Sequence, residues 1–199
     1  MDLTIKDGSG SGYAAKVDKN LRVHALAVSS SISQASAVGG DTYNVNTGTI
    51  ALTTATQTAV LYLKNNTDND LYIDSIGFLL GNSTSGTGDV SLEVIKNPTT
   101  GTLISNAVAA PIVENKNAGS SKVLDANVYK GVEGDTVTNG TDWYNSLLSG
   151  AARTYAIATG TLVIKSGNSI SVNITPQTSN TAMNVQVFMA VVEANGSIS

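Results

Sequence analysis

The chain has 199 residues, with 11 basic and 15 acidic side chains and a formal net charge of −4. It contains no cysteine and one histidine, which excludes disulfide scaffolds, thiolate metal sites and cysteine nucleophiles and leaves little for histidine-dependent catalysis. Only 13% of the residues are charged. The acidic balance argues against a nucleic-acid partner, because a phosphate-binding surface needs clustered Lys and Arg.

Small polar residues dominate the rest of the composition. Ser, Thr, Asn and Gly make up roughly four residues in ten, well above ordinary usage, while 41% of the residues are hydrophobic. This combination favours short strands joined by many turns. No run approaches the roughly 18 apolar residues of a membrane helix, and no secretory signal begins the chain. We expect no membrane partner and assembly inside a cell.

The chain begins with a Gly/Ser-rich stretch. Residues 8–12 read GSGSG, between short pieces that mix charged and apolar side chains. We predict an extended arm over residues 1–20, which could span about 65 Å and lie across a neighbouring subunit. A frayed terminus is the alternative interpretation. The remaining residues, 21–199, are expected to form a single domain.

Strand signals follow the arm. Residues 21–28 alternate as a first strand, and the low-complexity residues 29–36 are expected to be a connection. Residues 42–52 surround an Asn-Thr-Gly turn and form a plausible hairpin. Residues 59–64 predict a strand that ends in the turn sequence NNTDND at 65–70.

Further strands follow, and those at 90–94 and 170–175 have a clear period of two residues. The further strands are predicted at 71–80, 90–94, 160–165 and 170–175. Gly77 inside the first of them indicates a bulge or close packing. Residues 183–192 are apolar on both faces, so this strand is expected to be central in a sheet or covered by a partner.

The segment 107–153 is the least regular third of the chain. A strand is expected within 121–129 and a long loop at 130–140. Residues 142–148 are interpreted as one short helix with Thr141 or Asp142 as its cap.

About eight to ten strands at roughly 10-residue spacing, with almost no helix, predict an all-β fold. We expect an antiparallel β-sandwich, jelly-roll-like, with an extended N-terminal arm. The jelly roll is preferred to an immunoglobulin-like topology because the chain lacks a cysteine pair.

Several patterns imitate functional motifs. The 8–12 run lacks the Gly-Lys-Ser/Thr ending of a phosphate loop and fits a serine elbow in letters only. His24, on an alternating strand, is expected to be structural or part of an interface. Asp68 and Asp70 offer oxygens for calcium without the EF-hand spacing, and a solvated hairpin turn is the simpler interpretation.

Glu133 and Asp135, with Asp142 a few residues further on, could supply a carboxylate pair for glycoside hydrolysis, although a loop of mixed charge is more ordinary. We therefore predict no catalytic residue, no cofactor and no metal site.

Tyr129, Trp143 and Tyr144 form the densest group of aromatic residues in the sequence. Such side chains can stack on sugars, as in a carbohydrate-binding module, or anchor a protein interface. The low aromatic content, 5%, favours an interface or a local core. The full set of predicted interface residues is Lys6, Asp7, Tyr13, Lys16, Tyr129, Trp143 and Tyr144.

Residues 7–18, DGSGSGYAAKVD, followed by LRVHA at 21–25, resemble the opening of many tailed-bacteriophage virion proteins. The segment GGDTYNVNTG at 39–48 is similar in character. The Thr/Asn/Gly-rich strands beyond it resemble small phage head-decoration, or cement, proteins. This resemblance implies a virion structural role, a sandwich or jelly-roll core, and trimers seated on a capsid lattice.

The leading hypothesis is a non-enzymatic decoration protein on the capsid exterior, assembled in the host cytoplasm. It would form a homo-oligomer, expected to be a trimer, and clamp neighbouring major capsid protein subunits. An acidic protein suits the outside of a head that contains DNA. The alternatives are a tail, neck or head-fibre component that contacts a receptor, and a carbohydrate-binding module.

Overall fold

The computed structural model describes residues 5–6, 14–17, 23–24, 32–81, 89–105, 111–149, 153–177 and 183–194. The chain forms two separate units, Met1–Ser31 and Ile32–Ser199. The predicted arm, residues 1–20, falls within the first unit. That unit holds a small antiparallel sheet in the order β1-β2-β3, whose strands are β1 (Ile5–Lys6), β2 (Ala14–Val17) and β3 (Val23–His24).

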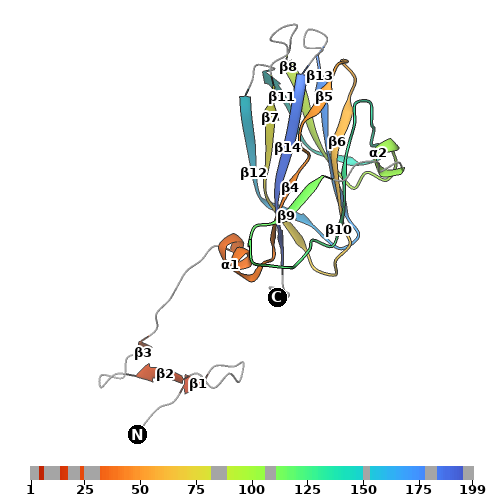
Figure 1. Cartoon of the computed structure of the whole chain (residues 1–199). Helices are drawn as coiled ribbons and strands as arrows, with labels where there is room; N and C mark the ends of the chain where they lie inside the picture. Colours follow the sequence, from red (N-terminus) through yellow and green to blue (C-terminus); the bar gives the residue numbers. More distant parts are fainter. Residues whose placement is uncertain are drawn as a thin grey trace. The chain divides into compact units, whose positions relative to one another are not determined.

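In its described residues, the second unit contains two antiparallel sheets and two short helices (Figure 1). One sheet has the order β10-β6-β13-β8-β11, and the other has the order β12-β7-β14-β4-β9, with β5 also paired to β14. The strands are β4 (Thr42–Asn46), β5 (Ile50–Leu52), β6 (Thr58–Asn65), β7 (Leu71–Leu80), β8 (Asp89–Lys96), β9 (Ile112–Asn115), β10 (Ala126–Lys130), β11 (Thr141–Ser149), β12 (Arg153–Ile164), β13 (Ser169–Pro176) and β14 (Met183–Glu193). The helices are α1 (Ile32–Gly39) and α2 (Thr102–Ser105).

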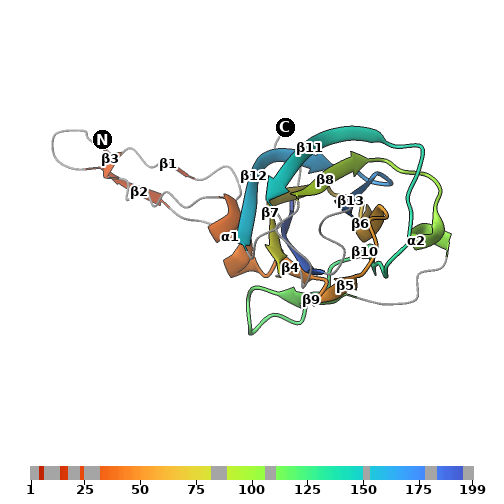
Figure 2. The same cartoon turned by 90° about the horizontal axis from the view of Figure 1, so that it is seen from above.

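The strand order is that of a jelly roll. We count β4 and β5 together as the first main strand, and β6, β7 and β8 as the second, third and fourth. The sheet that contains β14 then has the order first-eighth-third-sixth, and the other sheet has the order second-seventh-fourth-fifth. In this numbering β11 to β14 are the fifth to eighth strands, while β9 and β10 extend the sheet edges beside β4 and β6. The predicted antiparallel β-sandwich is therefore confirmed. Figure 2 shows the two sheets facing each other.

Inward-facing side chains of both sheets form one hydrophobic core. On β8 the alternating residues Val90, Leu92 and Val94 are at most 2% exposed, and they belong to the same cluster as Val187 and Met189 of β14. The period-two pattern in the sequence thus reports which side of each strand faces the other sheet.

Strand β14 is central, the first of the two alternatives that its apolar faces left open, because it lies between β7 and the β4/β5 pair. Its inner face enters the core, and on its outer face Ala190 and Val192 are also buried. Helix α1 packs against β4 and β14. No helix in the described part of the chain is long and apolar enough to cross a membrane.

Gly77 marks a close approach, as its place inside a predicted strand suggested. It pairs with Phe188 of β14 across the sheet. A Cβ atom added at Gly77 would lie 1.9 Å from Cζ of Phe188. The phenyl ring therefore occupies the space above the glycine, and only a residue without a side chain fits beneath it.

Three predicted elements are wrong. Residues 42–52 do not form a hairpin, because β4 and β5 both pair with β14 and not with each other. Residues 142–148 are not a helix but belong to strand β11, whose backbone pairs with β8 at the edge of the sheet. The sheet partner overrides a local sequence that carries only a weak period. Within 29–36, expected to be a connection, helix α1 begins at Ile32 and runs to Gly39. It ends before Gly40, which has a φ of +78°.

The N-terminal strand prediction, 21–28, corresponds in the described residues to β3 alone. The strand expected within 121–129 is confirmed in part as β10. The loop 130–140 is tied to the α2 region by an isolated bridge between Thr100 and Thr138.

Candidate interaction site

The first unit contains four of the predicted interface residues. Lys6 lies in β1, and Lys16 lies in β2 opposite His24 of β3. Asp7 and Tyr13 lie outside the described residues. Strands of two to four residues are shorter than the usual strand of a globular sheet.

The size of this unit has a physical consequence. Units of fewer than about 40 residues usually need a disulfide, a metal or a partner to be stable. Met1–Ser31 is below that size, and the chain has no cysteine. A surface of another molecule or of another copy is one means of supplying the missing burial.

The three predicted aromatic interface residues do not form one patch. Tyr129 lies on β10, whereas Trp143 and Tyr144 lie on β11, at the opposite edge of the same five-stranded sheet. Figure 2 shows these two strands at the two ends of that sheet. These residues are close in sequence but far apart in space, because the segment between them crosses from one edge of the sheet to the other.

Trp143 and Tyr144 are half-buried and pack against the main core. Their ring centroids are 6.2 Å apart at an interplanar angle of 41°. The register with β8 shifts between Asp142 and Tyr144, so this bulge adds one residue to the edge strand. Both rings therefore contribute to the sandwich itself, and only part of each is available to a ligand or partner.

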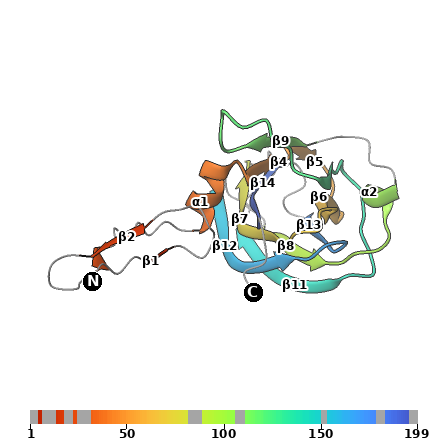
Figure 3. The same ribbon diagram turned by 90° about the horizontal axis from the view of Figure 1, so that it is seen from below.

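Tyr129 stacks on Tyr62 of the neighbouring strand β6, with ring centroids 5.7 Å apart and planes inclined by 15°. The pair belongs to a second, smaller hydrophobic cluster that includes Leu103 and Val137. Helix α2 contacts β6 and β10 and lies outside the sheet there (Figure 3). The short helix thus caps a local core, one of the two roles that the aromatic content favoured.

The acidic residues considered for glycoside hydrolysis fasten loops together. Glu133 accepts four hydrogen bonds, of 2.5–2.8 Å, from the backbone N–H and hydroxyl groups of Thr53 and Thr54. Asp135 accepts one from the Val132 N–H at 2.8 Å and one from the Thr102 hydroxyl at 3.1 Å.

These contacts also set the charge state of Glu133. Burial acts to raise the pKa of its carboxyl group, but the hydrogen bonds from the two threonines outweigh burial and hold the pKa below its usual value. A general acid needs a raised pKa. Glu133 is therefore suited to be a charged clasp between two loops.

The turn considered for calcium is organised around Asn65, which is fully buried. Its Nδ2 donates to the carbonyls of Asn69 and Ile164 at 2.8 and 2.9 Å. Its Oδ1 accepts from the N–H and hydroxyl of Thr67, each at 2.8 Å. Asp70 lies 3.6 Å from the Lys165 ammonium. The described residues contain no cluster of three potential metal-ligating side chains.

Three exposed apolar side chains that the sequence did not reveal lie on α1, on β9 and in the segment that follows β9. We call Val38, Ile112 and Val123 the apolar edge; these side chains are 81%, 58% and 82% exposed. Hydrogen bonds hold two of its segments together, because Asn117 donates to the Val38 carbonyl at 2.9 Å and Lys122 pairs with Asp41 at 2.6 Å. No periodic pattern in the sequence identifies these residues. Residues 29–36 were expected to be a connection, so helix α1, which carries Val38, was not predicted.

The chain matches no known family, and a search of curated proteins found no similar sequence.

Proposed function

We propose that this protein is a non-enzymatic structural component of a tailed-bacteriophage virion, a head decoration protein. As a homo-oligomer on the outside of the capsid, it would clamp neighbouring major capsid subunits by buried area. The observation that carries this proposal is the division of the chain into a jelly-roll unit with its own core and a small N-terminal unit.

The two units suggest different tasks. The sandwich buries a continuous core of its own, so its fold does not depend on the 31 residues that precede it. The N-terminal unit has too little chain for such a core and would gain stability by docking on a partner. An arm exchanged between subunits is an economical way to add contact area in a symmetric oligomer. We propose a trimer.

The surface of the sandwich also supports a role in assembly. The apolar edge places two valines that are more than 80% exposed on segments held together by hydrogen bonds. Docking of another molecule on this surface would remove these apolar groups from water, which is favourable. The fold itself supports the proposal only weakly, because jelly rolls serve in viral capsids and also in lectins.

The first test is the number of copies in purified particles, measured by quantitative mass spectrometry against the most abundant capsid protein. Hundreds of copies in a near-integer ratio are expected. A dozen copies or fewer would place the protein in the tail, neck or a head fibre, and its absence from particles would refute a virion role.

The second test is deletion of residues 1–31. We expect capsid binding and oligomerisation to be lost while the thermal unfolding of the sandwich is unchanged. A double charge reversal in the first unit, Lys6→Glu with Lys16→Glu, should weaken binding. The matched control, Lys64→Glu with Lys116→Glu on the sandwich, should not. Unchanged binding after the deletion would refute the role of the arm.

A further inference from the structure

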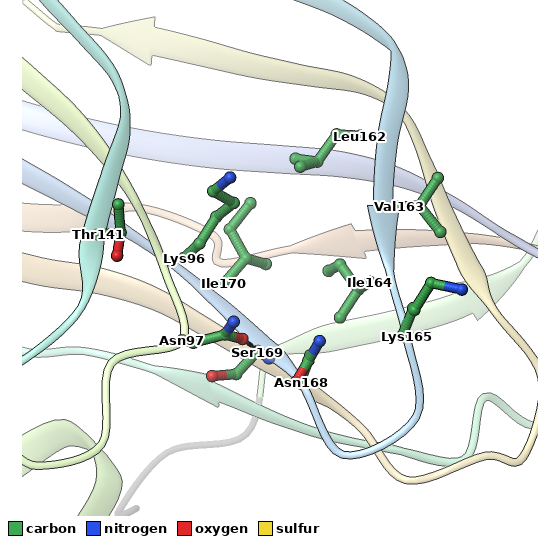
Figure 4. A pocket seen from close by; sticks show the side chains of 10 residues that line it. All are labelled: Lys96, Asn97, Thr141, Leu162, Val163, Ile164, Lys165, Asn168, Ser169 and Ile170. Carbon is green, nitrogen blue, oxygen red and sulfur yellow. Dashed lines mark hydrogen bonds between the residues drawn. The ribbon is translucent and has the colours of Figure 1, made fainter.

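A pocket opens between the two sheets at one end of the sandwich (Figure 4). Its volume is about 310 Å³, close to the lower limit of roughly 300 Å³ for small-molecule sites. One wall comes from the end of β12 and the following hairpin, and the other comes from the ends of β8, β11 and β13. All lining residues belong to the sandwich unit, so the pocket does not depend on the proposed virion role.

Lys96 is the central feature of the pocket. It continues the inward-facing series Val90, Leu92 and Val94 on β8 and pairs in register with Ile170. Figure 4 shows its ammonium group above Ile170, pointing toward Leu162. The described residues provide no ion pair or hydrogen bond for this group. Lys96 is only half-buried, so its charge is not sealed in the core and remains available to a ligand.

The second lysine at the pocket behaves differently. Lys165 lies 3.6 Å from Asp70, and Figure 4 shows its side chain directed away from Lys96. Its charge is therefore partly balanced outside the pocket. Lys96 is left as the cation that faces the interior.

Amide groups add further donors. Asn97 adopts a φ of +51°, and its Oδ1 accepts the Ser169 N–H at 2.9 Å. This bond fixes the amide plane, and Figure 4 shows the nitrogen on the side of Lys96. Asn168, from the hairpin, also directs its amide nitrogen upward in this view, beside Ile164.

The charge of the pocket is opposite to that of the chain. The sequence has 15 acidic and 11 basic residues, yet two lysines and no carboxylate line the pocket. A concave site with one sign of charge and several N–H donors favours an anionic ligand that is rich in acceptors.

The remaining wall is apolar. Leu162, Ile164 and Ile170 are 1–6% exposed and form its inner surface. A ligand that satisfies both parts of the pocket carries a carboxylate for Lys96 and a compact frame with one apolar face and several hydroxyl groups. We propose that the pocket binds an acidic monosaccharide, a uronic acid unit, with the sugar carboxylate paired to the Lys96 ammonium.

The test is a titration of the full-length protein with sodium glucuronate, followed by ¹⁵N–¹H NMR. Glucose tests the same frame without the charge, and sodium acetate at equal ionic strength tests the charge without the frame. We expect glucuronate alone to shift the amide signals of residues 96–97, 141 and 162–170. Lys96→Met should weaken binding at least about tenfold, as expected for a lost charged hydrogen bond.

Two further variants make the test specific. Asn97→Asp retains an acceptor for Ser169 but adds a negative charge, and it should also weaken glucuronate binding. Lys64→Met removes a lysine from the same sheet outside the pocket and should have no effect. Thermal unfolding checks that each variant folds.

The proposal is overturned by any of four results: no shifts at the pocket, equal binding of glucose, equal binding of acetate, or full affinity in a folded Lys96→Met variant. Equal binding of acetate would identify a general anion site.

Discussion

The contact between Gly77 and Phe188 gives the sharpest stability prediction. In Gly77→Ala the new methyl carbon would start 1.9 Å from Cζ of the ring, whereas carbon atoms pack at about 3.5–4.0 Å. The ring must therefore move by about 2 Å or the sheet must open. Overpacking of this kind costs about 1–3 kcal/mol. We expect a loss of about 2 kcal/mol, or a Tm lower by about 4–8 °C for a domain of this size.

The assay is thermal and urea unfolding followed by circular dichroism. Gly119→Ala is a suitable control, because the nearest atom to its new Cβ is 3.5 Å away, and it should change stability by less than about 0.5 kcal/mol. In a Phe188→Ala background the ring is absent, so Gly77→Ala should cost nothing further. The reasoning is refuted if Gly77→Ala is neutral in the natural protein, or if its cost is the same in both backgrounds.

Three further predictions concern the loops and the β11 edge. Asn65→Ala should lower the free energy of unfolding by about 3 kcal/mol in chemical denaturation, because it leaves buried hydrogen-bonding groups unpaired. Asn66→Ala, at the exposed neighbour, should change the free energy of unfolding little. Similar losses for both variants would contradict the buried network. The pKa of Glu133 is lower in the folded than in the unfolded protein, so the stabilisation by its carboxylate is complete above the ordinary pKa of 4.5 and is lost as the pH falls through the depressed pKa. Glu133→Gln should flatten this part of the stability–pH curve. An unaltered curve would argue against a stabilising contact between Glu133 and the two threonines. Trp143→Ala should destabilise the sandwich by about 2 kcal/mol, since the ring packs against the core; loss of glycan-array binding without loss of stability would instead identify a sugar platform.

The strands that could be predicted are those with one face in the core. Residues 90–94 and 170–175 alternate clearly in sequence, and they lie within β8 and β13 in the middle of their sheet. The two-sided apolar pattern of 183–192 narrowed its position to a central strand or a strand covered by a partner, and β14 is central. Local sequence is sufficient in these cases because neighbouring strands on both sides impose the same in–out alternation.

Edge strands and contacts between the two sheets were harder to predict. Strand β11 has a neighbour on one side only and carries a bulge, so its alternation is interrupted at Trp143. The wide separation of this residue from Tyr129 follows from strand order, a long-range property that spacing along the chain does not contain. Lys96 did leave a signal, since it extends the Val90, Leu92 and Val94 series, but its meaning depends on the opposing wall supplied by β12.

The central place of β14 has a consequence for how the protein is made. Thr42 of β4 pairs with Val192, about 150 residues later in the chain. At translation rates of roughly 5–20 residues per second, β4 waits about 8–30 s after its synthesis for this partner. The sheet that contains β4, β7 and β14 can therefore close only late, and such long-range pairing is slow to form. Until then unpaired strand edges are available to other nascent chains, so crowding on polysomes rather than the stability of the finished sandwich is expected to limit the yield of folded protein.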